Sequence, residues 1–208
     1  MQSVTVLPDP PIHIVKQIQD IFFNFLWNNK VDKVKRNTVI GNYEDGGLKM
    51  PHVLSFVHAL KFSWIKRVLD PDNYAPWKVL LTDVLEDLGQ DKFWYYSQSA
   101  LKVLSGKFNP FWKNVINVWA SVKDDPSTAP EEILSQPIWH NGRIRVGGQP
   151  VFFSHWAKSG IFFINDLIKK DGSLLSLTDL KNNYNINIHF LEYHSIMLSI
   201  PQEWKSIL

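Results

Sequence analysis

The chain has 208 residues, of which 45% are hydrophobic and 20% charged, a balance typical of a folded globular protein rather than a disordered one. Its net charge of +2 does not demand a nucleic-acid partner, and the absence of cysteine excludes disulfides, thiol catalysis and cysteine-ligated metals. The N-terminus lacks the basic start and long apolar run of a signal peptide, and no stretch approaches the ~20 apolar residues of a membrane span. We therefore expect an intracellular protein, in the cytoplasm or nucleus, with no membrane partner.

The first predicted helix runs from Ile12 to Trp27, because apolar residues recur there at helical spacing. We expect its apolar face to lie in the core, since a membrane-surface helix would carry more Lys and Arg on its polar side. This face consists of Ile14, Ile18, Ile21, Phe22, Phe25 and Leu26.

A turn signal follows at 44–47, where Asp-Gly and Gly-Gly accept positive φ at little cost. Short apolar runs on both sides predict a β-hairpin at about 38–50. Pro51 suits the first position of a second long helix that ends before Asp70-Pro71. Three further helices are predicted at 76–88, 92–104 and 110–122.

The stretch 124–136 begins with two acids, two prolines, Ser and Thr within residues 124–130, and it is the best candidate for a linker. Beyond it, Arg143–Val146 alternates polar and apolar residues before Gly147-Gly148, which predicts a second hairpin at about 143–153. Short helices are predicted to end near 168 and to span 177–184 and 189–198.

The predicted fold class is mainly α, with two short hairpins around 38–50 and 143–153. We divide the chain into a helical region at 1–123, the linker at 124–136 and a smaller α+β lobe at 137–208. The nine tryptophans predict an aromatic-rich core, because each ring buries a large apolar area.

No pattern predicts an independent enzyme. The only Asp-Asp pair, Asp124-Asp125, lies in a polar loop without a preceding strand, so a linker turn is favoured over a metal site. The histidines lack metal-ligand spacing, and His140 is interpreted as a core or capping residue. The paired glycines lack the downstream lysine of a phosphate-binding loop, and no serine occupies a nucleophile elbow. We expect no catalytic residue, cofactor or metal.

Basic residues are concentrated near the first helix. Lys30, Lys33, Lys35 and Arg36 lie within seven positions, and such a cluster forms either a solvated loop or a phosphate contact. Arg143 and Arg145 on the second hairpin form a second candidate site. We expect these six residues to contact nucleic-acid backbone without sequence choice.

Several short motifs follow one another along the chain. Residues 25–30, Phe-Leu-Trp-Asn-Asn-Lys, resemble the Phe-(Leu/Ile)-Trp-x-x-Lys segment that follows the thumb in LINE-type non-LTR retrotransposon reverse transcriptases. A basic stretch, a Gly-Gly-Leu-x-x-Pro motif and a Trp-containing helix follow in the family's order, and matches continue to the end of the chain at 200–204. The motif positions are Phe25, Trp27, Gly46, Gly47, Pro51, Trp64, Trp139 and Asn141.

The resemblance implies a thumb-end and post-thumb region without the palm aspartates, which lie upstream in that family together with the endonuclease and fingers. The implied role is to help hold template RNA or template–primer duplex beside the palm and fingers of a parent polymerase. The cysteine–histidine element found near the end of many relatives is absent here, so a zinc-dependent grip is not expected.

A different class of function remains open. The chain can also be a free-standing helical protein-interaction remnant, in which the helix from Ile12 to Trp27 is an adhesive surface that self-associates or binds a protein. A decayed element without any role would keep the same sequence pattern.

Overall fold

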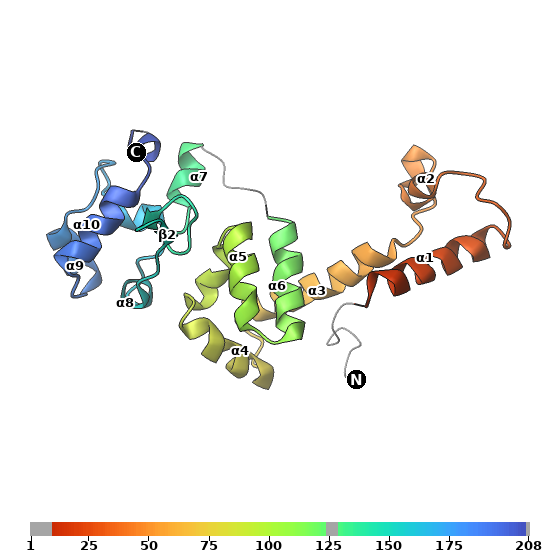
Figure 1. Ribbon diagram of the computed structural model, residues 1–208, viewed down its shortest axis with the longest axis horizontal. Coiled ribbons are helices and arrows are strands. Elements are labelled where there is room, and N and C mark those ends of the chain that lie inside the picture. Colours follow the sequence, from red (N-terminus) through yellow and green to blue (C-terminus); the bar gives the residue numbers. More distant parts are fainter. Residues whose placement is uncertain (1–9, 124–128, 207–208) are drawn as a thin grey trace.

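The computed structural model of the chain describes residues 10–123 and 129–206. Helices dominate these residues, and their only sheet is a two-stranded antiparallel hairpin, which confirms the predicted mainly α class. Figure 1 shows three parts in a row: a projecting arm, a central helical part and a C-terminal part.

The arm consists of α1 (Ile12–Leu26), α2 (Arg36–Ile40), the 3-10 helix η2 (Tyr43–Asp45) and the first half of α3 (Val53–Leu69). α1 lies beside the start of α3, while α3 continues into the central part and packs against α6 (Pro110–Ser121) (Figure 1).

A side chain of α1 fixes the start of α3. Gln19 Oε1 accepts a hydrogen bond from the Val53 backbone N–H at 2.8 Å, and Gln19 Nε2 donates to the Pro51 carbonyl at 3.3 Å. The helix-capping residue, His52, makes no capping hydrogen bond through its own side chain. Gln19 therefore satisfies a helix-end donor that would otherwise lack an intrahelical acceptor.

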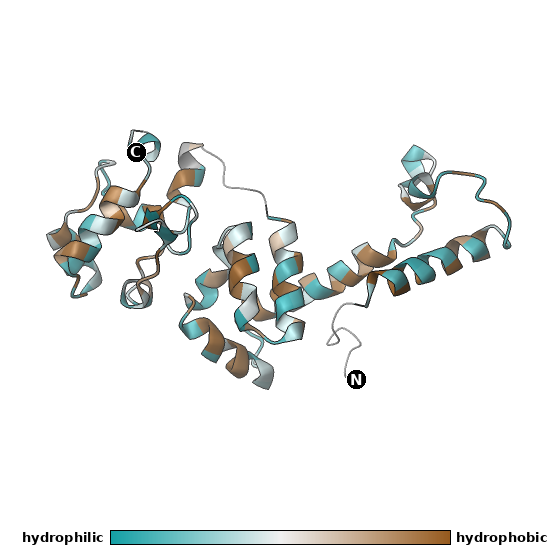
Figure 2. Cartoon of the chain, viewed as in Figure 1, coloured by the Kyte–Doolittle hydropathy of each residue, from teal (hydrophilic) through white to brown (hydrophobic). Residues whose placement is uncertain are grey.

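The predicted core face of α1 is wrong for most of its members. The buried residues of the helix are Val15 and Phe23. Figure 2 shows apolar and polar residues alternating along α1, and the helix carries a second apolar face beside the buried one. We call this face the α1 stripe; its large side chains are exposed, and they are Ile18, Ile21, Phe22 and Phe25.

The predicted hairpin at 38–50 is also wrong. Residues 36–40 form α2, and no strand occurs in this part of the described chain. The chain nevertheless reverses there, because the Leu48 N–H donates to the Val39 carbonyl at 2.9 Å. The glycine pair signals this reversal, but the two apolar residues before it are too few to distinguish a helical turn from a strand.

The central part contains α4 (Pro76–Glu86), η3 (Gln90–Tyr95), α5 (Gln98–Leu104), η4 (Ser105–Lys107) and α6. The predicted helix at 92–104 is divided into η3 and α5, because the Ser97 hydroxyl accepts from the Ala100 N–H and caps a new helix. Asn109 caps α6 in the same way through Trp112 N–H.

The C-terminal part contains α7 (Pro130–Leu134), the hairpin of β1 (Arg145–Val146) and β2 (Gln149–Pro150), α8 (Ser154–Lys158) and η5 (Ile164–Leu167). It ends with α9 (Leu177–Tyr184), α10 (Phe190–Ser199) and α11 (Gln202–Lys205). The second predicted hairpin is confirmed in a shorter form. The predicted linker contains α7, and its residues 124–128 lie outside the described part of the chain.

The core extends without interruption from the central part to the C-terminal part. Its buried residues form one hydrophobic cluster that begins at Trp64 on α3 and ends at Trp204 on α11. All nine tryptophans are buried or half-buried, as their number predicted. The division of the chain into domains stays a prediction.

Candidate nucleic-acid interface

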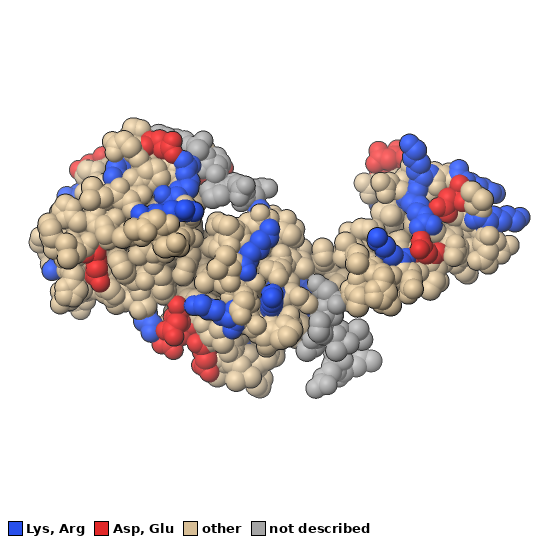
Figure 3. Space-filling model, in the orientation of Figure 1, with Lys and Arg blue, Asp and Glu red and all other residues tan. Residues whose placement is uncertain are grey.

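The basic cluster of the arm lies on the loop between α1 and α2. Asn28 and Asn29 adopt left-handed backbone conformations with φ of 52° and 56° and end α1, so the chain turns outward there. Lys30, Lys33 and Lys35 are exposed, and no described residue forms an ion pair with them. Figure 3 shows basic side chains gathered on the arm, with acidic ones between them.

Arg36 differs from the three lysines because its donors are already bound. Its Nε donates to Asp32 at 2.8 Å, and a terminal nitrogen donates to Asp20 on α1. The guanidinium carbon lies 4.6 Å from the ring centroid of Phe23. Hydrogen bonds to Asp32 and Asp20 raise the pKa of Arg36 above its ordinary value. Arg36 therefore joins α2 to α1 instead of facing a ligand.

The second predicted site lies in the C-terminal part, at the opposite end of the molecule from the arm (Figure 1). Arg143 pairs with Glu203, and its guanidinium carbon lies 5.2 Å from the Trp204 ring centroid. Arg145 Nε donates to the Gly142 carbonyl at 2.7 Å. The structure does not bring the two predicted basic sites together.

The motif residues of the arm shape its turn. Gly46 has a φ of 76°. A Cβ on Gly47 would lie 2.1 Å from the Gly41 carbonyl oxygen, which leaves no room for any other residue. Pro51 supplies a carbonyl to Gln19, and Trp27 is half-buried. Phe25 alone is almost fully exposed, at 89%.

The remaining motif residues belong to the core. Trp64 is buried among aromatic rings, and Trp139 is fully buried with its indole N–H donating to the Ile161 carbonyl at 2.9 Å. Buried Asn141 donates to the Pro137 carbonyl at 2.8 Å and accepts from the Arg143 N–H at 2.9 Å. These contacts give the motif positions a structural role in the fold.

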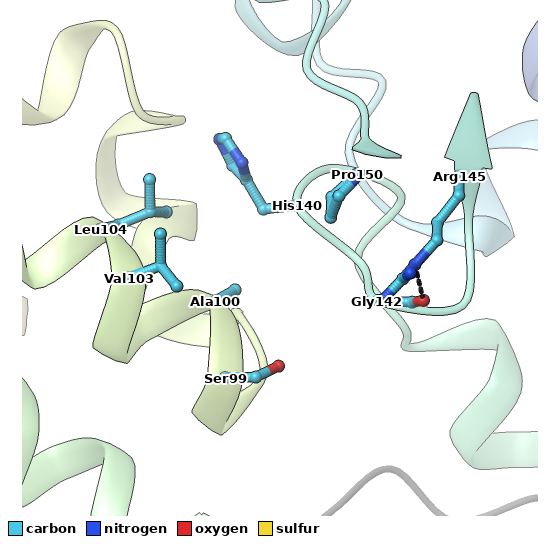
Figure 4. A pocket seen from close by; sticks show the side chains of 8 residues that line it. All are labelled: Ser99, Ala100, Val103, Leu104, His140, Gly142, Arg145 and Pro150. Atoms are coloured by element: carbon cyan, nitrogen blue, oxygen red, sulfur yellow. Dashed lines mark hydrogen bonds between the residues drawn. The ribbon is translucent and has the colours of Figure 1, made fainter. Parts of the chain in front are cut away.

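A pocket that the sequence did not indicate lies between α5 and the loop that carries the hairpin (Figure 4). Its volume is about 220 Å³. The residues that line it are Ser99, Ala100, Val103, Leu104, His140, Gly142, Arg145 and Pro150. The two sides are about 40 positions apart in the sequence, so no local pattern could reveal the pocket.

His140 packs between aromatic rings at the side of this pocket. Its ring stacks on Phe152 at 5.0 Å between centroids and meets the edge of Tyr96 at 5.1 Å. Burial, aided by the positive charge of Lys107, lowers the pKa of His140 to about 4. The ring is therefore neutral at pH 7, which agrees with its interpretation as a core residue.

No group of three or more potential metal ligands occurs among residues 10–123 and 129–206. Asp124-Asp125 lies outside the described residues. Within the described helices, none is both long and apolar enough to cross a bilayer. Comparison with models of protein families, with curated proteins and with solved structures finds no match to this chain.

Proposed function

We propose that the chain is a non-catalytic nucleic-acid-binding module, which corresponds to the C-terminal region of a LINE-type RNA-directed DNA polymerase. In this role it helps to hold template RNA or template–primer duplex and depends on a separate palm for any chemistry. The observation that carries the proposal is the set of three exposed lysines, Lys30, Lys33 and Lys35, on the loop of a projecting arm.

The arrangement of charges in the arm supports this proposal. Asp32 on the lysine loop and Asp20 on α1 are both bound to Arg36. These two carboxylates therefore satisfy Arg36, and Lys30, Lys33 and Lys35 have no ion-pair partner among the described residues. Lysines in this state bind a polyanion by releasing its counterions, and they do so without reading its sequence.

The test is the salt dependence of RNA binding by the whole chain, measured by fluorescence anisotropy with a labelled single-stranded RNA. Each phosphate contact contributes about 0.7 to the slope of log K against log salt concentration for a single strand. Lys30→Gln/Lys33→Gln/Lys35→Gln should therefore weaken binding and reduce the slope by roughly 2.

The matched control removes the same charge elsewhere. Lys102, Lys113 and Lys170 are exposed, and none forms an ion pair with a described residue. Their triple replacement by Gln should leave the slope close to that of the unaltered chain. Equal slopes for both triple variants would contradict the proposal, as would a lack of binding at low salt.

A second candidate function rests on the α1 stripe. Its exposed side chains lie along one helix, and a contiguous apolar surface of this kind marks an interaction site in many proteins. In this alternative the chain is a helical protein-interaction element that associates with itself or with another protein.

Sedimentation velocity separates the two candidates. Ile21 is 62% exposed on the stripe, so Ile21→Lys should abolish self-association if the stripe mediates it. Val79→Lys on α4 is the matched control, because Val79 is 63% exposed outside the stripe. A chain that sediments as a monomer at all concentrations would remove self-association as its role.

A further inference from the structure

The pocket between α5 and the hairpin loop has one wall from each of two distant segments. Figure 4 shows side chains of α5 on one side and His140, Pro150 and Arg145 on the other. Val103, Leu104 and Pro150 make the walls mostly apolar. Drug-sized ligands usually occupy pockets of about 300–1,000 Å³. At about 220 Å³ this pocket is smaller and suits a single ring system.

Arg145 gives the pocket a charged group in a fixed orientation. Its Nε is held by the Gly142 carbonyl at 2.7 Å (Figure 4). Among the described residues, no acceptor binds the two terminal nitrogens of this guanidinium. A guanidinium fixed through Nε presents its remaining donors in the planar arrangement that matches phosphate or carboxylate oxygens.

The surroundings of Arg145 favour an anion. None of the described residues that line the pocket is acidic. Lys107 is close enough to act on the His140 ring, so the region has a second positive charge. The His140 ring is uncharged at pH 7, so it can lie beside the polar edge of a ligand without electrostatic repulsion. Its Nε2 makes no hydrogen bond to any described residue.

We propose that this pocket binds one nucleotide unit, with the base between α5 and Pro150 and the phosphate on Arg145. The apolar walls of Val103, Leu104 and Pro150 would cover the faces of the base. The Ser99 hydroxyl at the edge lies 3.2 Å from the Ser97 hydroxyl and keeps a lone pair that can accept a hydrogen bond from the polar rim of the base. This inference rests on the proposed function and names a site for a single base distinct from the lysines of the arm.

The test uses the whole chain and the four nucleoside 5′-monophosphates as probes, with binding followed by saturation-transfer NMR and titration. Ser99→Trp places a bulky ring at the pocket and should abolish binding of every probe. Thr82→Trp, at an exposed position of α4 that does not line the pocket, is the control and should bind normally. Near-UV circular dichroism establishes that both variants are folded.

Arg145→Gln tests the phosphate contact separately. Loss of a charged hydrogen bond should weaken monophosphate binding about tenfold while leaving binding of the matching nucleosides unchanged. Lys102→Gln, on α5 but outside the pocket lining, removes the same charge and should have no effect. Equal weakening by both variants would overturn the phosphate assignment and with it the proposal.

The outcomes also separate this inference from the proposed function. Monophosphate binding that is lost in Ser99→Trp but retained in the triple lysine variant supports the pocket whether or not the chain binds RNA. Absence of monophosphate binding, or preference for hexanoate over all four nucleotides, overturns the pocket and leaves the role of the arm standing. If RNA displaces a bound monophosphate, the natural ligand is a base of a strand; if RNA binds without displacing it, the ligand is a free nucleotide.

Discussion

Arg36 and Asp20 form an ion pair that joins the short helix α2 to the middle of α1, and the same guanidinium lies over the Phe23 ring. Asp32 binds the other side of Arg36 at 2.8 Å. One side chain therefore connects two helices and the loop between them, and this loop is the one that carries the candidate phosphate-binding lysines.

Arg36→Gln should reduce the free energy of unfolding by about 1 kcal/mol, because it removes a half-exposed ion-pair network together with a cation–π contact. Urea denaturation at low ionic strength measures the change, and added salt should diminish it. Lys33→Gln is the neighbouring control and should leave stability unaltered. If both variants unfold at the same urea concentration, Arg36 does not stabilise the packing of α2 on α1.

Gly47→Ala should disrupt the turn of the arm. The new methyl carbon would lie 2.1 Å from the Gly41 carbonyl oxygen, which is backbone and has no freedom to move aside. We expect a loss of roughly 1–3 kcal/mol, in the range of overpacked sites. Gly106→Ala meets no atom within 4 Å and should change stability by less than about 0.5 kcal/mol. Thermal or urea unfolding of the two variants provides the comparison.

Trp64→Ala should be severely destabilising. The ring is 8% exposed and meets Trp77, Phe111 and Trp112 at centroid distances of 5.3, 5.2 and 6.1 Å. Removal of a buried tryptophan costs about 3–5 kcal/mol. Trp64→Phe should recover a large part of that loss because it retains edge contacts. An unchanged melting temperature in the alanine variant would show that the ring is not part of the core.

Stability should fall on acidification through the titration of His140. Its folded pKa is about 4, below the ordinary 6.5, so the unfolded chain binds more protons between these values. Above pH 6.5 the ring is neutral in both states and does not reduce the free energy of unfolding. As the pH falls from 6.5 towards 4, the free energy of unfolding decreases because the unfolded chain takes up the proton more readily. After allowance for partial exposure of the ring, we expect the titration of His140 to lower the free energy of unfolding by roughly 2–3 kcal/mol between neutral pH and pH 4.

The comparison for this prediction is His140→Asn, since asparagine tolerates the left-handed backbone of this position, where φ is 52°. The variant will be less stable at pH 7, because the ring contacts are lost. Its further loss between pH 6.5 and pH 4 should be smaller than that of the unaltered chain. Parallel acid-unfolding curves would contradict the assigned pKa.

The sequence predicted the helices of the chain well where strong boundary signals flank them. Asn109-Pro110 marks the start of α6, and the predicted α9 matches the observed one at both ends. Ser97 was missed as a boundary, because a serine inside an apolar pattern gives a cap only when the backbone turns there.

The surroundings of the candidate site residues could be predicted only in part, because tertiary contacts decide them. Periodicity identifies apolar faces on α1 but does not decide which of two adjoining faces is covered; α3 and Arg36 select Val15 and Phe23. Charge composition likewise grouped Arg36 with the lysines, although Asp20 on α1 and Asp32 on the loop bind it. The pocket at Arg145 depends on segments that only the fold brings together.

A single continuous helix, α3, connects the arm to the central part of the molecule. Its first half lies beside α1 and its second half enters the core, with no break between Val53 and Leu69. A helix advances by about 100° and 1.5 Å per residue, so a single inserted residue near its middle would swing the lysine loop by more than a quarter turn. The length of α3 therefore sets the direction in which the loop with Lys30, Lys33 and Lys35 points. An insertion in α3 would turn these lysines away from their present direction without altering any residue of the loop.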